Sequence, residues 1–563
     1  MSAYLEPRIA PRAIFDALEE RSTRVRYMVR EGDDYRAVTW GAHAREIRQI
    51  GLFLLEELKT GDTAAIFAPN RVEWMSAAMA IQSVGGVMVP IYPSSTADQA
   101  SYVLNHADAK VLFVDTEPLL ARILQAWPEL RSLRRIVLFD ATIDVAKVLS
   151  QVDGGPSFAD VERKIVPWDK ALALGAARDR EEPHAFDQAL GSVSLTQPGL
   201  MLYTSGTSGR PKGVPLTHQN VAANGADWLQ VNAPLVEEGA VDLLWLPMSH
   251  IFGFGEACLG NSLGWTSYMS DPARVVDDLP KVQPQVFMSV PSLWEKLARS
   301  ALKEEEREAQ NAALHKATGG NLKFCLSGGA GLKREIKELY HGAGVLLIEG
   351  YGLTECSPTL TLNRPDAFRF DSVGKPLPSV ELRLAEDGEI LAKGPNVFSG
   401  YHKDPAASAD AFSDGWFKTG DIGRWTEDGF LQIVDRKKDI LVTAGGKNVA
   451  PANIEIRFVD DPFITHLVVY GDSRKYLVAA VWTDRAAVEA KLGADANAEA
   501  IRSLVGRRID RANAELARFE TIRKFTVVDT PLTVEGGLLT PTLKVKRKAV
   551  YQRFSDVFEE LYR

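Results

Sequence analysis

The sequence predicts an α/β protein with a large N-terminal domain, made of two αβ-layered subdomains and a β subdomain, followed by a small α+β C-terminal domain. Three observations predict this architecture. The chain has 563 residues, more than one hydrophobic core needs. Short apolar runs alternate with amphipathic stretches over its first part, and strict apolar–polar alternation follows. A dense charge cluster at residues 435–439 then precedes a differently patterned C-terminal part.

Four apolar runs in the first part of the chain have the length and composition of buried strands. The amphipathic stretches 47–58 and 73–84 have helical periodicity. Because strands alternate with helices, we expect mostly parallel sheets with helices on their faces. The pattern returns between about residues 199 and 347, which predicts a second layered subdomain. The four runs are 64–67, 87–91, 110–114 and 136–139.

The pattern of apolar and polar residues changes after about residue 370. Residues 380–384 and 389–393 alternate strictly, and Glu386-Asp387-Gly388 joins them, which predicts a hairpin within an antiparallel β subdomain over about 370–434. The charge cluster that follows is by itself also typical of a solvated turn. We predict an N-terminal domain over residues 1–435 and a C-terminal domain over 436–563, which is an ordinary length for a small domain.

Composition excludes several classes of protein. With 45% hydrophobic and 25% charged residues, the chain is typical of a globular protein. A net charge of −9 gives no reason to expect a nucleic-acid partner. Cys258, Cys325 and Cys356 are too few and too scattered for a disulfide framework or a zinc site, and they suit a reducing cytoplasm. Neither a signal peptide nor a transmembrane segment is expected, although peripheral membrane contact and the oligomeric state stay open.

The stretch 203–213, Tyr-Thr-Ser-Gly-Thr-Ser-Gly-Arg-Pro-Lys-Gly, is a candidate phosphate-binding loop. Glycine allows tight turns, and successive backbone N–H groups can then surround an anion. The hydroxyl groups add donors, and Arg210 and Lys212 add positive charge. The spacing differs from that of a Walker A motif. Composition alone therefore leaves two interpretations, a nucleoside triphosphate site or a flexible surface loop.

Tyr351-Gly352-Leu353-Thr354-Glu355 follows the apolar run 345–348, so it is placed at the end of a predicted strand, where α/β sheets bind ligands. The tyrosine could stack on a base and the threonine could hold a phosphate. The glutamate could hold Mg²⁺, which prefers oxygen ligands. A structural turn is the alternative interpretation of the same five residues.

These motifs occur with others in a fixed order, and together the chain resembles the superfamily of AMP-forming, carboxylate-activating enzymes. That superfamily contains acyl-CoA synthetases, aryl-CoA ligases, luciferases and the adenylation domains of peptide synthetases. The motifs at 415–421, 433–439 and 539–547 most resemble those of long-chain fatty acyl-CoA synthetases. The further motifs are 246–250, 327–330, 415–421, 433–439, 445–448 and the lysine cluster at 539–547.

The resemblance implies that a carboxylic acid reacts with ATP to form acyl-AMP, and then with CoA, in the presence of Mg²⁺. It implies that Thr354 holds the α-phosphate, that Glu355 holds Mg²⁺ and that Asp421 and Arg436 hold the ribose. Gly352 belongs to the same turn as Thr354. The residues implied for the β- and γ-phosphates are Thr204, Ser205, Gly206, Thr207, Ser208, Gly209 and Lys212, and those implied for adenine are Gly328, Gly329, Ala330 and Tyr351.

The resemblance also implies a mobile C-terminal domain that carries a catalytic lysine. Lys544 fits this role, with Lys546 as the alternative two residues away, and Lys438 matches the hinge. Gly445, Gly446 and Lys447 would face the CoA channel after rotation. His250, with a catalytic role, and Phe254 would border the acyl pocket. Ile251, Phe252 and the surroundings of Leu326 could line the same tunnel or could be plain core.

Two kinds of alternative to this reaction stay open: another enzyme with the same first step, and a protein without catalysis. An aryl-CoA ligase, or an enzyme that loads acyl-AMP onto a separate carrier protein, would use the same first step. An amino acid is not expected as the substrate, because Pro247-Met248-Ser249-His250 lacks the aspartate that would pair with its ammonium group. A nucleotide-binding protein without catalysis is the more distant alternative. The residues leave the length and type of the acid open, with a medium- or long-chain fatty acid favoured by the resemblance.

Overall fold

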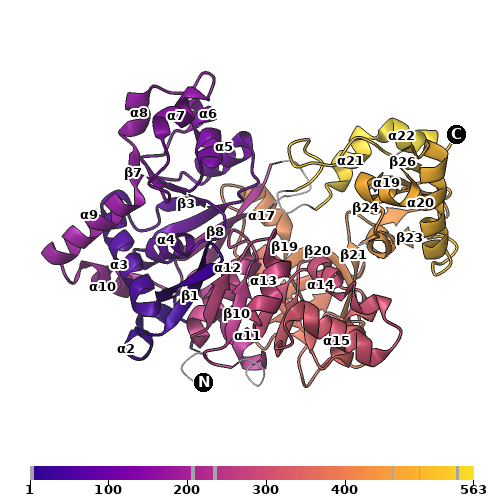
Figure 1. Ribbon diagram of the computed structural model, residues 1–563, viewed down its shortest axis with the longest axis horizontal. Coiled ribbons are helices and arrows are strands. Elements are labelled where there is room, and N and C mark those ends of the chain that lie inside the picture. The colour runs from indigo at the N-terminus through magenta and orange to yellow at the C-terminus, as the bar shows by residue number, and fades with distance from the viewer. Residues whose placement is uncertain (1–5, 205–209, 233–236, 460, 494, 541–543) are drawn as a thin grey trace.

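The computed structural model describes residues 6–204, 210–232, 237–459, 461–493, 495–540 and 544–563. Figure 1 shows a large α/β body that contains most of the chain, and a smaller domain, coloured orange to yellow, that carries the C-terminus. The predicted class, an α/β chain with a large N-terminal and a smaller C-terminal domain, is confirmed. No helix in the described part of the chain combines the length and apolar character needed to span a membrane.

The first layered subdomain is built on a seven-stranded sheet in the order β7-β6-β5-β3-β4-β8-β9. The pairs are parallel except that β9 runs antiparallel to β8. The four predicted strands are present as β3, β4, β5 and β6. The strands span Thr63–Phe67 (β3), Val87–Ile91 (β4), Val111–Val114 (β5), Arg135–Leu138 (β6), Ile165–Pro167 (β7), Pro198–Thr204 (β8) and Lys212–Thr217 (β9).

Both faces of this sheet are buried, which explains why its strands are apolar throughout. Ala64 and Ile66 of β3 belong to one core and Ala65 and Phe67 to another, as the alternation of side chains along a strand requires. Helices α3 and α4 supply the first core, and α5 and α6 the second. The helices here are α1 Arg12–Phe15, α2 Leu18–Arg21, α3 Trp40–Glu57, α4 Val72–Ser83, α5 Ala97–His106, α6 Glu117–Gln125, α7 Val145–Ser150, α8 Phe158–Glu162, α9 Trp168–Glu181 and α10 Ala185–Ser192.

The second layered subdomain contains a nine-stranded sheet in the order β16-β15-β14-β13-β12-β10-β11-β1-β2. Its first strands come from the start of the chain, since β1 pairs in parallel with β11. The strands span Val25–Glu31 (β1), Asp34–Thr39 (β2), Val241–Leu244 (β10), Thr266–Met269 (β11), Val286–Ser289 (β12), Phe324–Ser327 (β13), Leu347–Gly352 (β14), Thr359–Leu362 (β15) and Lys375–Pro376 (β16). The helices are α11 His218–Asn232, α12 Ile251–Leu263, α13 Val275–Val282, α14 Pro291–Ala298, α15 Arg307–Thr318 and α16 Arg334–Gly342.

The β subdomain is a five-stranded antiparallel sheet, and its first two strands form the predicted hairpin. Glu381 pairs with Lys393 and Leu384 with Ile390. Gly388 in the turn has φ +84°, a conformation that favours glycine. Its elements are β17 Glu381–Leu384, β18 Glu389–Lys393, α17 Pro405–Ala411, β19 Phe412–Ser413, β20 Trp416–Trp425 and β21 Leu431–Arg436.

The C-terminal domain packs around hydrophobic clusters of its own, drawn from residues between Leu441 and Phe558. Its central sheet has the order β24-β25-β26, and a short hairpin, β22 with β23, precedes it. The elements are β22 Leu441–Val442, β23 Asn448–Val449, α18 Pro451–Glu455, β24 Ile464–Tyr470, β25 Leu477–Thr483, α19 Arg485–Leu492, α20 Ala498–Asn513, β26 Ile522–Val527, α21 Arg547–Arg553 and α22 Ser555–Glu560.

Candidate active site

The two ends of the predicted phosphate loop lie side by side. Thr204 ends β8 and Lys212 begins β9, and the two residues are register partners. Tyr102 contacts the end of the loop that leads into β9. Its hydroxyl donates to the Pro211 carbonyl at 3.0 Å, and the Arg210 guanidinium lies 5.1 Å from its ring centroid. The remaining loop residues, Ser205, Gly206, Thr207, Ser208 and Gly209, lie outside the described residues, so their roles stay predictions.

Tyr351, Asp421 and Arg436 meet in one hydrogen-bonded group. The Tyr351 hydroxyl donates to Asp421 Oδ2 at 2.7 Å, and Arg436 Nε lies 2.8 Å from Asp421 Oδ1. Asp421 and Arg436 face each other across β20 and β21, which explains how residues 15 positions apart come together. Asp421 is buried, and this burial raises the pKa of its carboxyl although the charge of Arg436 opposes the shift.

Glu355 lies in a short 3-10 turn, Thr354–Cys356, directly after β14. Its Oε1 accepts a hydrogen bond from the Tyr401 hydroxyl at 3.1 Å, and burial raises the pKa of the carboxyl. The ammonium of Lys212 lies 4.6 Å from the centroid of the Tyr401 ring. Tyr401 therefore connects the phosphate loop with the predicted metal ligand. Sequence reasoning missed this tyrosine, because an isolated Gly-Tyr pair carries no specific signal.

The turn is compatible with Mg²⁺, because the ion prefers oxygen ligands and often uses one or two carboxylates together with substrate phosphates. Glu355 offers such a carboxylate beside Thr354, whose side chain is half-buried. Gly352 has a steric role in the same turn: a Cβ there would lie 1.8 Å from the Pro358 carbonyl oxygen. The close approach of these two backbone segments requires glycine.

Gly328, Gly329 and Ala330 follow β13, and the C-terminal domain contacts Gly329. Lys544 Nζ donates to the Gly329 carbonyl at 2.9 Å. Although this side chain keeps contact with solvent, desolvation by the surrounding protein lowers the pKa of its ammonium, and the nearby charge of Arg436 adds to the effect. Of the two candidate lysines, Lys544 is thus the one whose ammonium is placed on the large domain beside Arg436. Residues 541–543 lie outside the described residues.

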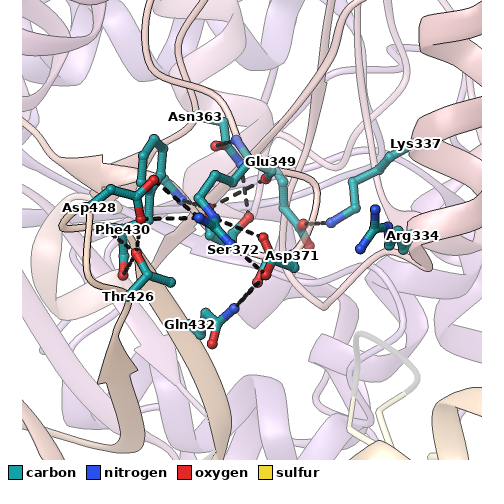
Figure 2. A network of polar contacts seen from close by, with 12 residues as sticks. Arg334, Lys337, Glu349, Asn363, Asp371, Ser372, Thr426, Asp428, Phe430 and Gln432 are labelled. Carbon is teal, nitrogen blue, oxygen red and sulfur yellow. Dashed lines mark hydrogen bonds and ion pairs between the residues drawn. The ribbon is translucent and has the colours of Figure 1, made fainter.

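A network of polar contacts supports the strands that carry this site (Figure 2). Glu349, two residues before Tyr351 in β14, forms a buried ion pair with Lys337 of α16 at 2.6 Å, and its other oxygen accepts from the Leu332 backbone N–H at 2.9 Å. In β21, the Gln432 amide donates to Asp371 at 2.9 Å. The position of Tyr351 and Arg436 therefore depends on side chains outside the site itself.

His250 lies at the start of α12, where its Nδ1 accepts a hydrogen bond from the Phe252 backbone N–H at 3.1 Å. Desolvation lowers the pKa of His250 to about 4, so the ring is neutral at neutral pH. Phe254 is buried in the same helix and packs on Trp74 with ring centroids 6.2 Å apart.

A cavity extends between α11 and α12, and several residues expected near the acyl chain line it. Ile251, Phe252 and Phe254 of α12 contribute, as does Leu326 at the end of β13. Phe252 also packs against Gly328, where a Cβ would lie 3.1 Å from its ring. His250 precedes these lining residues directly. Phe252 therefore connects the lining of the cavity with the Gly328 backbone.

The predicted hinge and CoA-side residues lie beyond β21. Lys438 is exposed two residues after its end. Gly445, Gly446 and Lys447 form the exposed turn between β22 and β23. Backbone hydrogen bonds of this turn stay within the C-terminal domain, since Gly446 donates to Thr443 at 2.8 Å. The structure therefore places Lys544, rather than these three residues, against the large domain.

Comparison with known families agrees with this arrangement. A family model described as AMP-binding enzyme matches residues 15–402, and one described as AMP-binding enzyme C-terminal domain matches residues 438–563. The chain therefore belongs to the AMP-binding enzyme family, and the resemblance noted in the sequence is confirmed.

Among individual proteins, the chain is similar to the long-chain-fatty-acid–CoA ligase FadD15 of Mycobacterium bovis, with 33% identity over 93% of this chain and 92% of the relative. It is 30% identical to the peroxisomal long chain acyl-CoA synthetase 6 of Arabidopsis thaliana, over 96% and 83% of the two chains. In fold it is similar to the adenylation domain of a carboxylate reductase from Mycobacterium chelonae (TM-score 0.83, 23% identity, 100% and 92% covered). A further structural neighbour is the anthranilate CoA ligase AuaEII in complex with anthranoyl-AMP (TM-score 0.75, 21% identity, 98% of each chain covered).

Proposed function

We propose that this protein activates a medium- or long-chain fatty acid with ATP and transfers the acyl group to CoA, releasing pyrophosphate and AMP. The observation that carries the proposal is the contact of Lys544 with Gly329, because it brings a cation of the C-terminal domain beside Asp421 and Arg436. The relatives named as long-chain-fatty-acid–CoA ligases support the class of acid.

In the first step, a carboxylate oxygen would attack the α-phosphorus of ATP, and the bond to the pyrophosphate oxygen would break. Two anions must approach each other, so oriented donors and cations have to offset their repulsion. Lys212 and the loop 204–209 would hold the β- and γ-phosphates, Thr354 the α-phosphate, and Lys544 would bridge the carboxylate and the α-phosphate. Mg²⁺ held by Glu355 would supply further positive charge to the phosphates.

The nucleoside would lie against Tyr351 and Gly352, with Gly328, Gly329 and Ala330 framing adenine. Asp421 would accept hydrogen bonds from the ribose hydroxyls, and Arg436 would approach the same sugar. Both carboxylate oxygens of Asp421 already accept protein donors, from Tyr351 and Arg436. That pairing orients the carboxylate before the nucleotide arrives, which reduces the entropy lost on binding.

In the second step, the CoA sulfur would attack the acyl carbonyl carbon and AMP would leave with the bonding electrons. We propose that the C-terminal domain beyond Lys438 rotates about this residue between the steps. Rotation would remove Lys544 from Gly329 and bring Gly445, Gly446 and Lys447 toward the thiol. The neutral ring of His250 would border the acyl carboxylate without adding charge, and Phe254 would line the acyl chain.

The test is a panel of carboxylic acids, with and without CoA, followed by AMP release and by the mass of the product. We expect AMP and acyl-CoA from fatty acids, with no turnover when Mg²⁺ is removed. Products from aromatic acids alone would indicate an aryl-CoA ligase, and acyl-AMP that CoA does not consume would indicate a carrier-protein ligase. Absence of ATP–pyrophosphate exchange with every acid would contradict an enzymatic role.

The expected location in the cytoplasm also stays a proposal. It rests on the three cysteines, all of which are free thiols in the structure. Fractionation of cells with an antibody to the protein would test it, and enrichment in a membrane fraction would favour peripheral membrane association.

A further inference from the structure

The cavity between α11 and α12 is mainly apolar, but one end is polar. Gln82 at the end of α4 and His218 at the start of α11 line it there, on either side of Gly199. The Gln82 amide donates to the Gly199 carbonyl at 3.1 Å. The His218 ring packs on the same glycine so closely that a Cβ at position 199 would lie 2.3 Å from it. Gly199 thus allows both side chains to reach one end of the cavity.

Each of these side chains has a polar atom that makes no hydrogen bond within the described part of the chain. The atoms are Gln82 Oε1 and His218 Nε2. Gln82 is 2% exposed and His218 is 4% exposed. A buried polar atom without a partner is costly, and such atoms are uncommon in folded proteins. Glu256 also lines the cavity and has buried carboxyl oxygens without a hydrogen bond in the described part of the chain, but Gln82 and His218 lie together beside Gly199, where one ligand group could satisfy both.

The polar end is far from the reacting groups. Gly199 precedes Thr204 by five residues along β8, which corresponds to about 17 Å of extended chain. Thr359, four residues after Glu355, also lines the cavity, and the Asn224 side chain donates to its carbonyl at 2.7 Å. Asn224 lies six residues after His218 in α11, about 9 Å along the helix axis. An acid bound with its carboxylate near Gly328 would direct its chain toward His218.

The chemistry of the two groups restricts what they can bind. Burial lowers the pKa of His218 to about 4, so the ring is neutral and can either donate or accept one hydrogen bond at Nε2. Gln82 Oε1 can only accept. A hydroxyl group can donate to Gln82 and pair with the histidine at the same time. A methyl group would leave both atoms unpaired.

We propose that Gln82 and His218 form a subsite for a hydroxyl group near the distal end of the acyl chain, so that the preferred substrates are hydroxylated fatty acids. This inference rests on the proposed function, and it narrows the substrate class of the same site. Sites built to hydrogen-bond a substrate hydroxyl discriminate strongly against analogues that lack it, because the polar groups of the protein are then left unpaired.

The test compares pairs of acids of equal chain length, one with a terminal hydroxyl and one without, over a series of lengths. The readout is kcat/KM for AMP release with the full-length protein. At the best length we expect the hydroxylated acid to be preferred by about 10- to 100-fold. His218→Phe and Gln82→Leu each replace a polar group by an apolar one of similar size. Each should reduce the ratio of kcat/KM for the hydroxylated acid to that for the plain acid about 10-fold.

Leu229→Val is the matched control, since Leu229 lines the same cavity from α11 and is apolar. It should change kcat/KM for the two acids by the same factor. Thermal unfolding of each variant separates loss of folding from loss of preference, and the plain acid serves as an internal control of activity. Equal kcat/KM for both acids in the wild type, or variants that affect the two acids equally, would overturn the subsite. If no acid of either kind is activated, the proposed function fails instead.

Discussion

At the scale of single residues, burial controls the charge of the groups around the site. It raises the pKa values of Glu355 and Asp421, and desolvation lowers those of Lys544 and His250. Each shift favours the neutral form of the group, because burial disfavours an isolated charge. Anionic phosphates and Mg²⁺ would reverse part of these shifts when they bind, because opposite charges favour the ionised forms.

Lys544→Ala should slow the formation of acyl-AMP by about 10²–10³-fold, as expected for the loss of one electrostatic contact in the transition state. Thioester formation from preformed acyl-AMP should stay close to the wild-type rate. The two half-reactions can be followed separately by pyrophosphate release and by thiol consumption. Lys546→Ala is the matched control and should affect neither step strongly. Equal losses in both steps for Lys544→Ala would show that its role is assigned wrongly.

His43 gives the protein a predictable sensitivity to acid. The ring is fully buried, and burial lowers its pKa to about 3 from the ordinary value of 6.5. Because the folded pKa is depressed, the stabilising contribution of the neutral ring is present above pH 6.5 and is lost as the pH falls toward 3. The free energy of unfolding should therefore decrease by about 2 kcal/mol between pH 6.5 and pH 5 through this group.

Chemical denaturation at both pH values would measure this effect. His43→Leu should show a smaller loss of stability on acidification than the wild type. His184 is exposed, so His184→Leu is a suitable control and should keep the wild-type difference. An identical pH dependence for His43→Leu and the wild type would contradict the assignment.

At the scale of elements, the turn after β14 depends on close backbone packing. Gly352→Ala would place a Cβ 1.8 Å from the Pro358 carbonyl, so one of the two segments must move. Because Thr354 and Glu355 follow in the same turn, we expect a loss of at least 10-fold in acyl-AMP formation together with a lower thermal stability.

Gly191→Ala provides the control for this prediction. Gly191 lies in α10, and a Cβ there meets no atom within 4 Å. Alanine favours helix more than glycine does, so this variant should be as stable as the wild type or slightly more so. Unchanged activity in Gly352→Ala would show that the turn can relax without cost.

Elements with a strong local pattern could be predicted from the sequence, and others could not. The strand at 64–67 is a continuous apolar run, and the two strands of the hairpin at 380–393 alternate between apolar and polar residues. Both patterns can be recognised from residues that are close together in the sequence. The β1 strand was missed, because its parallel partner is β11, more than 200 residues later, and no local pattern indicates such pairing. The start of α3 was also missed: the helix begins at Trp40, where Thr39 accepts a hydrogen bond from the Ala42 N–H at 3.1 Å.

The residues of the candidate site likewise include some that could be predicted from the sequence and some that could not. Lys212 and Glu355 could be named from the sequence, because their motifs carry residue types suited to phosphate and Mg²⁺, whereas Asp421 was named only through the resemblance to the AMP-forming family. Tyr401 could not, since its role depends on a loop of the β subdomain folding over Glu355. The pair formed by Gln82 and His218 was missed for the same reason, because it meets only through the packing of α4 and α11 around Gly199.

At the scale of the whole molecule, the two domains have separate hydrophobic clusters and touch through polar contacts. Lys544 contacts the Gly329 carbonyl, and Lys333 Nζ donates to the Val459 carbonyl at 2.8 Å. Both contacts join polar atoms, so breaking them during rotation of the small domain would cost no hydrophobic stabilisation of its own.

Lys438→Pro tests this rotation. Proline fixes φ near −65°, so the backbone at position 438 could no longer change conformation. We expect acyl-AMP formation to continue and thioester formation to fall by at least 10-fold. Lys437 pairs with Glu389 at 2.7 Å, which places it on the large domain, so Lys437→Ala is the neighbouring control. Normal thioester formation in Lys438→Pro would exclude a hinge at this residue.

The contact between Lys544 and Gly329 also affects how this family can be studied. Its acceptor is a main-chain oxygen, which every amino acid carries, so a change of residue at position 329 removes no acceptor. The contact itself therefore imposes no coupling between the residue types at positions 329 and 544. Correlated substitutions among relatives will not report this contact between the domains, and its presence in solution has to be measured directly, for example by distance labels placed on either side of it.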